Sequence, residues 1–80
     1  MRTETYYETH PLVVEAARSF NYVDWHWYSD YNGDEAGFPE VCVVGLYGRT
    51  IDVEGQRVDI EALVDTENEH VLMYEVYIEE

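Results

Sequence analysis

Residues 25–38, "WHWYSDYNGDEAGF", bring several oxygen-bearing side chains together and could in principle hold a cation. Asp30, Asn32 and Asp34 stand at alternate positions, as the ligands of a calcium loop do. An EF-hand, however, needs a glycine at its sixth position and a glutamate at its twelfth. Counted from Asp30, the glycine comes fourth and the twelfth residue is Val41. The stretch is therefore better interpreted as a turn or loop than as a metal site.

Other residue types used in catalysis and metal binding form no working pattern. His10, His26 and His70 are far apart in sequence, and no cysteine accompanies them at the spacing of a zinc site. Carboxylates are so numerous that close pairs must arise by chance, so a glycosidase-type pair cannot be inferred. We therefore expect no catalytic residue, no metal and no cofactor, and the chain is not expected to be an enzyme.

The charge of the chain is strongly one-sided. Its 80 residues include 18 Asp and Glu but only four basic residues, all of them arginine, and the net charge is −14. This charge opposes direct binding to nucleic acid or to an anionic membrane. It favours a basic protein partner, a cation, or simply high solubility.

The spacing of the acids suits a surface that imitates nucleic acid. In a strand, acids at i and i+2, such as Asp52 and Glu54, recur at about 6–7 Å. In a helix, acids at i and i+4, such as Glu75 and Glu79, recur at about 6 Å, and both spacings are comparable with that of DNA phosphates. Tyrosines and tryptophans, which often anchor protein interfaces, lie among the acids. The residues predicted to contact a partner are Asp30, Asp34, Glu35, Glu40, Asp52, Glu54, Asp65, Glu67, Glu69, Glu75, Glu79, Tyr28 and Tyr31.

In its size, its acidity and its lack of a catalytic motif, the whole chain resembles small phage-encoded inhibitors that mimic DNA, such as anti-CRISPR and anti-restriction proteins. A local likeness covers about a quarter of the chain. There, "VEGQRVDIEALVDTENE" looks like the C-terminal part of small phage proteins, in which a short strand and "G-x-x-VDI-x-x-L" precede a final helix. The resemblances imply a phage-encoded stoichiometric inhibitor. Its acidic surface is expected to block the nucleic-acid-binding groove of a host defence complex of the CRISPR–Cas or restriction type.

Two other functions remain open at this point. The chain could be an adaptor that binds a basic protein other than a nuclease, or a structural or oligomeric domain whose acidity serves only solubility. The expected partner is a basic protein surface on a nucleic-acid-binding host effector, without direct contact to nucleic acid or membrane, and a homodimer also remains open. The expected location is the cytoplasm, that of the host cell if a phage encodes the chain, because the sequence opens without an apolar leader.

The elements that position the acidic and aromatic side chains are expected to form one small domain, residues 1–80. Pro11 suits the first turn of a helix, and apolar residues recur at helical spacing over residues 11–20. Strands are predicted over residues 40–48 and 49–53, followed by a turn at residues 54–56 and a short return. Cys42, in the apolar run "VCVVGL", is expected to be a small buried residue.

Residues 22–29 alternate between apolar and polar side chains and predict a further strand. Trp25 and Trp27 fall on one side of it and are expected to be buried, while Tyr28 falls on the other side. In this register Tyr28 faces outward together with Asp30, Asp34 and Glu35 on the exit loop.

The C-terminal segment supports two structures. Thr66 and Glu69 form the S/T-x-x-E pattern of a capping box, which favours a helix over residues 67–80 with Val71 and Tyr74 on its apolar stripe. Its β-branched and aromatic residues favour a strand instead. With the helix preferred, the predicted fold is a single α+β domain: an N-terminal helix, an antiparallel sheet of about three strands, and a C-terminal helix.

Overall fold

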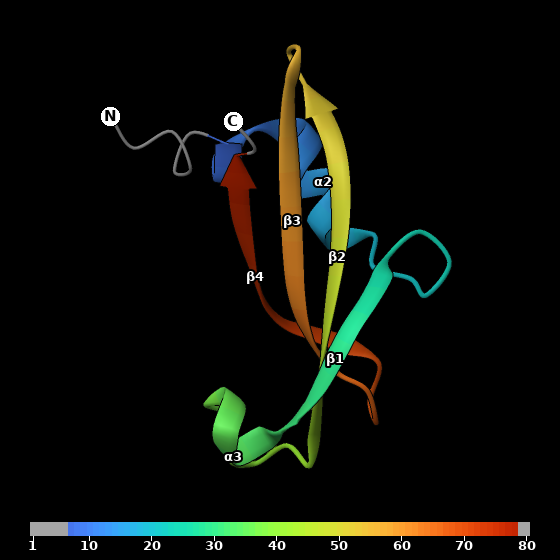
Figure 1. Cartoon of the computed structure of the whole chain (residues 1–80), viewed down its shortest axis with the longest axis vertical. Helices are drawn as coiled ribbons and strands as arrows, with labels where there is room; N and C mark the ends of the chain where they lie inside the picture. Colours follow the sequence, from blue (N-terminus) through green and yellow to red (C-terminus); the bar gives the residue numbers. More distant parts are fainter. Residues whose placement is uncertain (1–6, 79–80) are drawn as a thin grey trace.

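The computed structural model describes residues 7–78, which form a four-stranded antiparallel sheet in the order β1-β2-β3-β4 (Figure 1). Each strand pairs with the next one in sequence, so the sheet is a meander. A helix precedes the sheet, and a short second helix joins the first two strands. The elements are α2 (Pro11–Arg18), β1 (His26–Asn32), α3 (Gly33–Ala36), β2 (Val43–Val53), β3 (Gln56–Asp65) and β4 (His70–Ile78).

Helix α2 begins at Pro11, as predicted, and is held at its start by His10. The imidazole Nδ1 of His10 accepts a hydrogen bond from the backbone N–H of Leu12 at 3.2 Å. Its Nε2 lies 2.8 Å from a carboxylate oxygen of Glu54, in the turn between β2 and β3. One side chain therefore caps the helix and links it to the tip of the central hairpin. The helix ends at Arg18, slightly before the predicted boundary.

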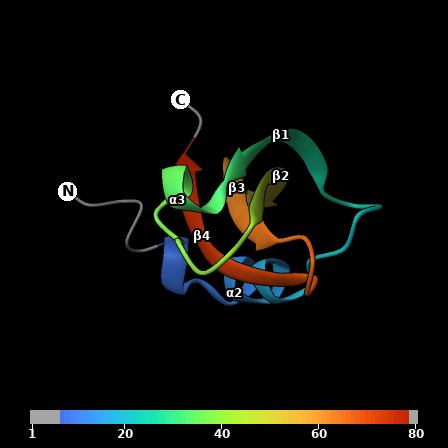
Figure 2. The same ribbon diagram turned by 90° about the horizontal axis from the view of Figure 1, so that it is seen from below.

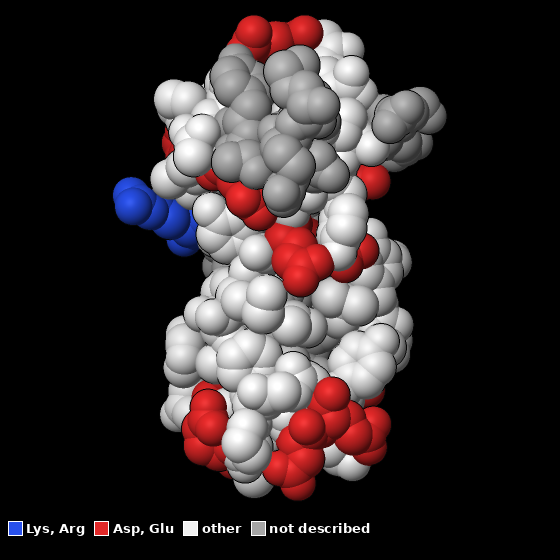
Figure 3. All heavy atoms as spheres, turned by 90° about the vertical axis from the view of Figure 1, so that its left-hand side faces the viewer, with Lys and Arg blue, Asp and Glu red and all other residues white. Residues whose placement is uncertain are grey.

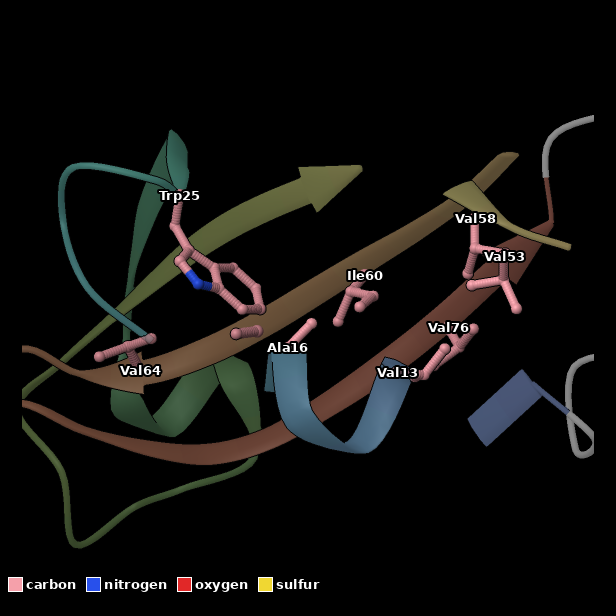
Figure 4. Close-up of a cluster of buried hydrophobic side chains, with 9 residues drawn as sticks. Val13, Ala16, Trp25, Val53, Val58, Ile60, Val64 and Val76 are labelled. Carbon is pink, nitrogen blue, oxygen red and sulfur yellow. The ribbon is translucent and has the colours of Figure 1, made fainter. Parts of the chain in front are cut away.

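The core lies between α2 and one face of the sheet (Figures 2 and 4). Strand β3 supplies alternate buried residues to it, and α2 presents Val13 and Ala16 from the other side. Burial of each large aliphatic side chain contributes roughly 1.5–3 kcal/mol, so this single layer holds the helix on the sheet. The buried cluster comprises Val13, Ala16, Trp25, Val53, Val58, Ile60, Ala62, Val64 and Val76.

The predicted strands 40–48 and 49–53 form one continuous strand, β2, which begins at Val43. Every residue of β2 from Val44 to Val53 pairs with β3, so no break in the hydrogen-bonded ladder separates the two predicted strands. The predicted turn follows, with Glu54 and Gly55 at φ values of 53° and 83°. The return strand is not short, because β3 extends for 10 residues.

The predicted C-terminal helix is wrong, and with it the α+β class: residues 70–78 form strand β4, so the described chain is mostly sheet. The capping-box residues lie in the turn between β3 and β4, where Asp65, rather than Thr66, accepts the backbone N–H groups of Glu67 and Asn68. Glu69 completes the turn at a φ of 56°. The β-branched and aromatic residues that follow then pair along the buried strand β3. Tertiary pairing therefore overrides the local helix signal.

Strand β1 begins at His26, later than predicted, because Asn21 forms a turn before it. The side-chain oxygen of Asn21 accepts the backbone N–H groups of Val23 at 3.0 Å and Asp24 at 2.8 Å. This local bonding satisfies backbone groups that a strand would otherwise pair. The alternation in the sequence therefore continues beyond the strand itself.

Only one of the two tryptophans is buried. Trp25 is 3% exposed, as expected, but Trp27 is 52% exposed, so the prediction for Trp27 is wrong. Trp27 lies on the edge strand β1, whereas α2 packs over β2 and β3. Its indole N–H donates to Asp30 at 2.9 Å instead of entering the core. Correct alternation thus places Trp27 on the helix side of the sheet, but beyond the reach of the helix.

Candidate protein-interaction surface

The sheet face opposite α2, called the open face below, has no helix over its centre (Figure 2). The strand register brings together side chains from β2, β3 and β4 on this face. Its successive cross-strand rows are Leu46–Leu63–Met73, Gly48–Glu61–Glu75 and Thr50–Asp59–Tyr77. An apolar row thus lies directly beside two rows that carry carboxylates.

The apolar row forms a shallow hollow of about 210 Å³. Met73 is 39% exposed there, while Leu46 and Leu63 are half-buried. Glu61 and Glu75 line the same hollow, so apolar and acidic groups meet in it. This combination can receive a side chain that is partly aliphatic and positively charged at its tip.

Glu61 lies at the centre of the open face and is half-buried. Its carboxylate makes no hydrogen bond or ion pair within residues 7–78. Burial raises the pKa of Glu61, and the nearby carboxylates of Glu75 and Asp59 raise it further. The centre of the open face therefore concentrates negative charge, and no ion pair within residues 7–78 offsets the charge of Glu61.

The two neighbouring acids are held by hydroxyl groups. Thr50 donates to Asp59 at 2.6 Å, and the Tyr77 hydroxyl donates to Glu75. The hydrogen bond to Glu75, with burial, raises the pKa of Tyr77 to about 12. These bonds fix the carboxylates in place but leave their negative charge intact.

Strand β1 supplies the predicted aromatic contact residues. Tyr28 is 48% exposed and lies over Gly48 on the open face, next to His26 at a ring distance of 5.3 Å. Tyr31 is 42% exposed and stands opposite Val44 in the register. Both tyrosines therefore border the open face and can contact a partner there.

Five of the predicted acids gather at the loop end of the sheet, where β1 and β3 finish and β2 and β4 start. All are exposed, and Figure 3 shows acidic side chains at this lower end and near the middle of the molecule. Glu35 accepts a hydrogen bond from Asn32 at 3.1 Å. The side chains of Asp34, Glu40 and Glu67 make none within residues 7–78. The five acids are Asp34, Glu35, Glu40, Glu67 and Glu69.

Asp52 and Glu54 lie at the opposite tip, in the hairpin between β2 and β3. Asp52 accepts the backbone N–H of Gly55 at 3.0 Å, and Glu54 contacts His10. Because Glu54 has a positive φ, it leaves the strand alternation that predicted a regular spacing with Asp52. Both carboxylates remain exposed.

Asp65, also predicted as a contact residue, is only 4% exposed, so its side chain presents little surface to a partner. Its carboxylate accepts the side-chain amide of Asn68 at 2.8 Å and two backbone N–H groups of the β3–β4 turn. The Asn68 amide lowers the pKa of Asp65, with the backbone donors acting in the same direction and burial in the opposite one. Asp65 is thus a structural residue of the turn.

The remaining predicted contacts differ in their surroundings. Asp30 is exposed but already accepts the indole N–H of Trp27. Glu75 belongs to strand β4 and not to a helix, so its predicted i, i+4 spacing with Glu79 does not apply. Glu79 itself lies outside the described residues.

The prediction missed the centre of the open face, namely Asp59, Glu61 and the apolar row. The signal was present in "RVDIEALVD", where polar and apolar residues alternate over the length of a strand. The predicted short return before a helix hides this alternation. A longer strand would have placed Asp59, Glu61 and Leu63 on one face.

No group of three or more His, Cys, Asp or Glu within residues 7–78 lies close enough to hold a metal ion. Cys42 precedes β2 and is exposed, so its predicted burial is wrong. Neither of the helices described has the length and apolar character needed to cross a membrane.

Comparison with known proteins adds no relative: no protein-family model, no curated protein and no solved structure matches the chain.

Proposed function

We propose that the chain is a stoichiometric protein inhibitor whose acidic surface occupies the nucleic-acid-binding groove of a basic host effector, of the CRISPR–Cas or restriction type. The observation that carries this proposal is the distribution of acids along the molecule. They occur at the loop end, in the middle of the open face and at the hairpin tip of a molecule whose longest extent is 38 Å. At 3.4 Å per base pair, that length corresponds to about 11 base pairs of duplex.

The nature of the surface supports the same proposal. No lysine occurs in the chain, so the acidic array is not interleaved with the usual surface cation. Exposed tyrosines on β1 and β4 can add contact area beside the acids. A groove lined by arginine and lysine would be attracted to such a surface at long range, and proteins with acidic surfaces would be repelled from it.

The test is a DNA-binding assay on purified effectors. Fluorescence anisotropy of a labelled duplex is measured with a panel of CRISPR effector complexes and restriction endonucleases, with and without the chain. For a targeted effector, DNA binding should disappear at one chain per binding site. Inhibition should weaken as salt rises, because exposed charges are screened. If no effector loses DNA binding at that ratio, the proposal is wrong.

Charge-neutral variants provide the matched comparison. Glu40→Gln with Glu67→Gln removes two carboxylates that make no hydrogen bond within residues 7–78, so the fold should persist. This variant should need several times more protein for the same inhibition. Glu8→Gln with Glu15→Gln, outside the array, should inhibit as the parent chain does. Equal inhibition by both variants would argue against phosphate mimicry and for an apolar interface.

A further inference from the structure

We infer that the open face is the docking site for an extended basic segment of the partner, with an arginine side chain between Glu61 and Glu75 and an adjacent apolar side chain in the Leu46–Leu63–Met73 hollow. The inference takes the basic nature of the partner from the proposed function. It adds which face of the chain makes the central contact and which side-chain chemistry that face accepts.

The first argument is a like-charge pair. Glu61 and Glu75 are direct cross-strand partners on β3 and β4. Side chains in such positions have Cβ atoms about 4.5–5.5 Å apart, and like charges there destabilise a sheet. Asp59 lies two residues along β3, on the same face, and adds to the repulsion. None of the three makes an ion pair within residues 7–78.

The second argument is the placement of the apolar hollow. It lies directly beside the carboxylate pair, and Glu61 and Glu75 form part of its wall. A partner side chain that entered it would remove water from around both carboxylates and strengthen their attraction to a cation. In the free chain, burial already raises the pKa of the half-buried Glu61 carboxyl group.

Arginine fits this arrangement better than lysine. Its planar guanidinium presents several N–H donors and can bond two carboxylates at once, whereas an ammonium acts as a point charge. Arginine also stacks on aromatic rings, and Tyr77 stands on the same face, beside Glu75.

A second copy of the chain is a poor occupant for the same face. It would bring the same carboxylates and a net charge of −14 against an identical surface. Like charges brought together at an interface oppose association. Charge complementarity therefore favours a basic partner over self-association.

The test uses a blocked hexapeptide in which arginine and leucine stand two residues apart with serine between them, so that both point to the same side of an extended chain. It is titrated into the ¹⁵N-labelled full chain and followed by NMR. Amide shifts should centre on Glu61, Met73 and Glu75. Replacing arginine with citrulline, which keeps the shape but removes the charge, should weaken binding about three- to tenfold. Replacing leucine with serine should also weaken it, because the hollow then stays unfilled.

Glu61→Gln should weaken the arginine–leucine peptide by a similar factor, and circular dichroism should show it folded because the substitution relieves repulsion. Glu15→Gln, on α2, removes the same charge elsewhere and should leave binding unchanged. The inference would be overturned by amide shifts centred on the loop end, or by equal peptide affinity of Glu61→Gln and the parent chain. It would also be overturned by a dimer in sedimentation whose formation shifts the amide signals of the open face. If Glu61→Gln binds the peptide as tightly as the parent while effectors are still inhibited, the docking site fails and the proposed function stands. If the parent chain binds the peptide through Glu61 but no effector loses DNA binding, the docking site stands and the proposed function fails.

Discussion

The side chain of Tyr28 occupies the space above Gly48 on the neighbouring strand. A Cβ atom added to Gly48 would lie 2.4 Å from both Cε2 and the hydroxyl oxygen of Tyr28, closer than real Cβ atoms approach. Tyr28 stands at the β-bulge between Trp27 and Ser29, and alternation from Trp27 directs its side chain towards the open face. The absence of a side chain at Gly48 therefore leaves the space that the Tyr28 ring occupies.

Gly48→Ala should displace the Tyr28 ring and leave the fold intact. The clash involves the far end of a flexible side chain, so the ring can move aside while the β1–β2 pairing remains. The aromatic NMR signals of Tyr28 should shift, and stability should fall by about 1 kcal/mol or less.

A double substitution separates the clash from other effects. With Tyr28→Ala in place, Gly48→Ala should become neutral or stabilising by about 0.5–1 kcal/mol, because alanine suits a strand interior better than glycine. The coupling between the two sites is measured by denaturant unfolding of the four proteins. Equal destabilisation by Gly48→Ala in both backgrounds would contradict the contact.

Trp25 and Trp27 should differ sharply in their contribution to stability. Trp25 packs in the core beside Phe20, with ring centroids 5.5 Å apart, whereas Trp27 is half exposed. Trp25→Ala should lower the free energy of unfolding by about 3–5 kcal/mol, which is enough to leave most molecules of a small domain unfolded. Trp27→Ala should cost about 1 kcal/mol or less. Thermal melts by circular dichroism give both values.

Trp25→Phe is the control that keeps an aromatic ring in the core but removes the indole N–H group. Within residues 7–78, the buried indole N–H of Trp25 has no hydrogen-bond partner. Phenylalanine removes this unpaired donor, which offsets part of the free energy lost with the smaller ring. The loss of stability should therefore be well below that of Trp25→Ala. An equal loss would show that the N–H group is satisfied in solution.

The sequence predicted local elements better than it predicted their partners. Pro11 and helical spacing located α2, and Glu54-Gly55 located the hairpin, because both depend on a few neighbouring residues. The fate of residues 70–78 depends instead on β3, whose buried face offers a full ladder of backbone partners. A capping-box pattern carries no information about that pairing, so the helix prediction failed.

The candidate site was predictable only in part, for the same reason. The exposed acids of the loops, such as Asp34 and Glu40, follow from their place between elements. The pairing of Glu61 with Glu75 requires the register of β3 and β4, which no local pattern specifies. The burial of Asp65 likewise follows from the turn that closes around its carboxylate.

Added salt should raise the melting temperature of the chain. Its net charge of −14 causes greater repulsion in the compact state than in the expanded one, and salt screens that repulsion. Sodium and potassium should therefore stabilise as well as calcium does at equal ionic strength. A saturable rise at low calcium concentration would contradict this and indicate a specific site at Asp30, Asn32 and Asp34.

Asp65→Asn should destabilise the chain at neutral pH. Hydrogen bonds from Asn68 and the turn backbone lower the pKa of Asp65 in the folded state. The stabilisation is therefore present above the unfolded pKa, near 3.9, and is lost as pH falls through the lower folded pKa. In melts over a range of pH, the parent chain should exceed the variant at neutral pH, and the gap should close in acid. Asp34→Asn, which removes a carboxylate without a described hydrogen bond, should show no such gap.

Glu61→Gln should have the opposite effect on stability. Burial and the charges of Glu75 and Asp59 raise the pKa of Glu61 in the folded state, so the folded chain binds this proton more tightly than the unfolded chain does. Ionisation of Glu61 then destabilises the fold as pH rises above the unfolded pKa and through the folded one. The variant should melt about 2–4 °C higher than the parent at neutral pH, as expected for about 0.5 kcal/mol in a domain of this size. The difference should vanish in acid, where the parent carboxyl is protonated too. A melting temperature for Glu61→Gln below that of the parent at neutral pH would mean that a cation already pairs with this carboxylate in the free chain.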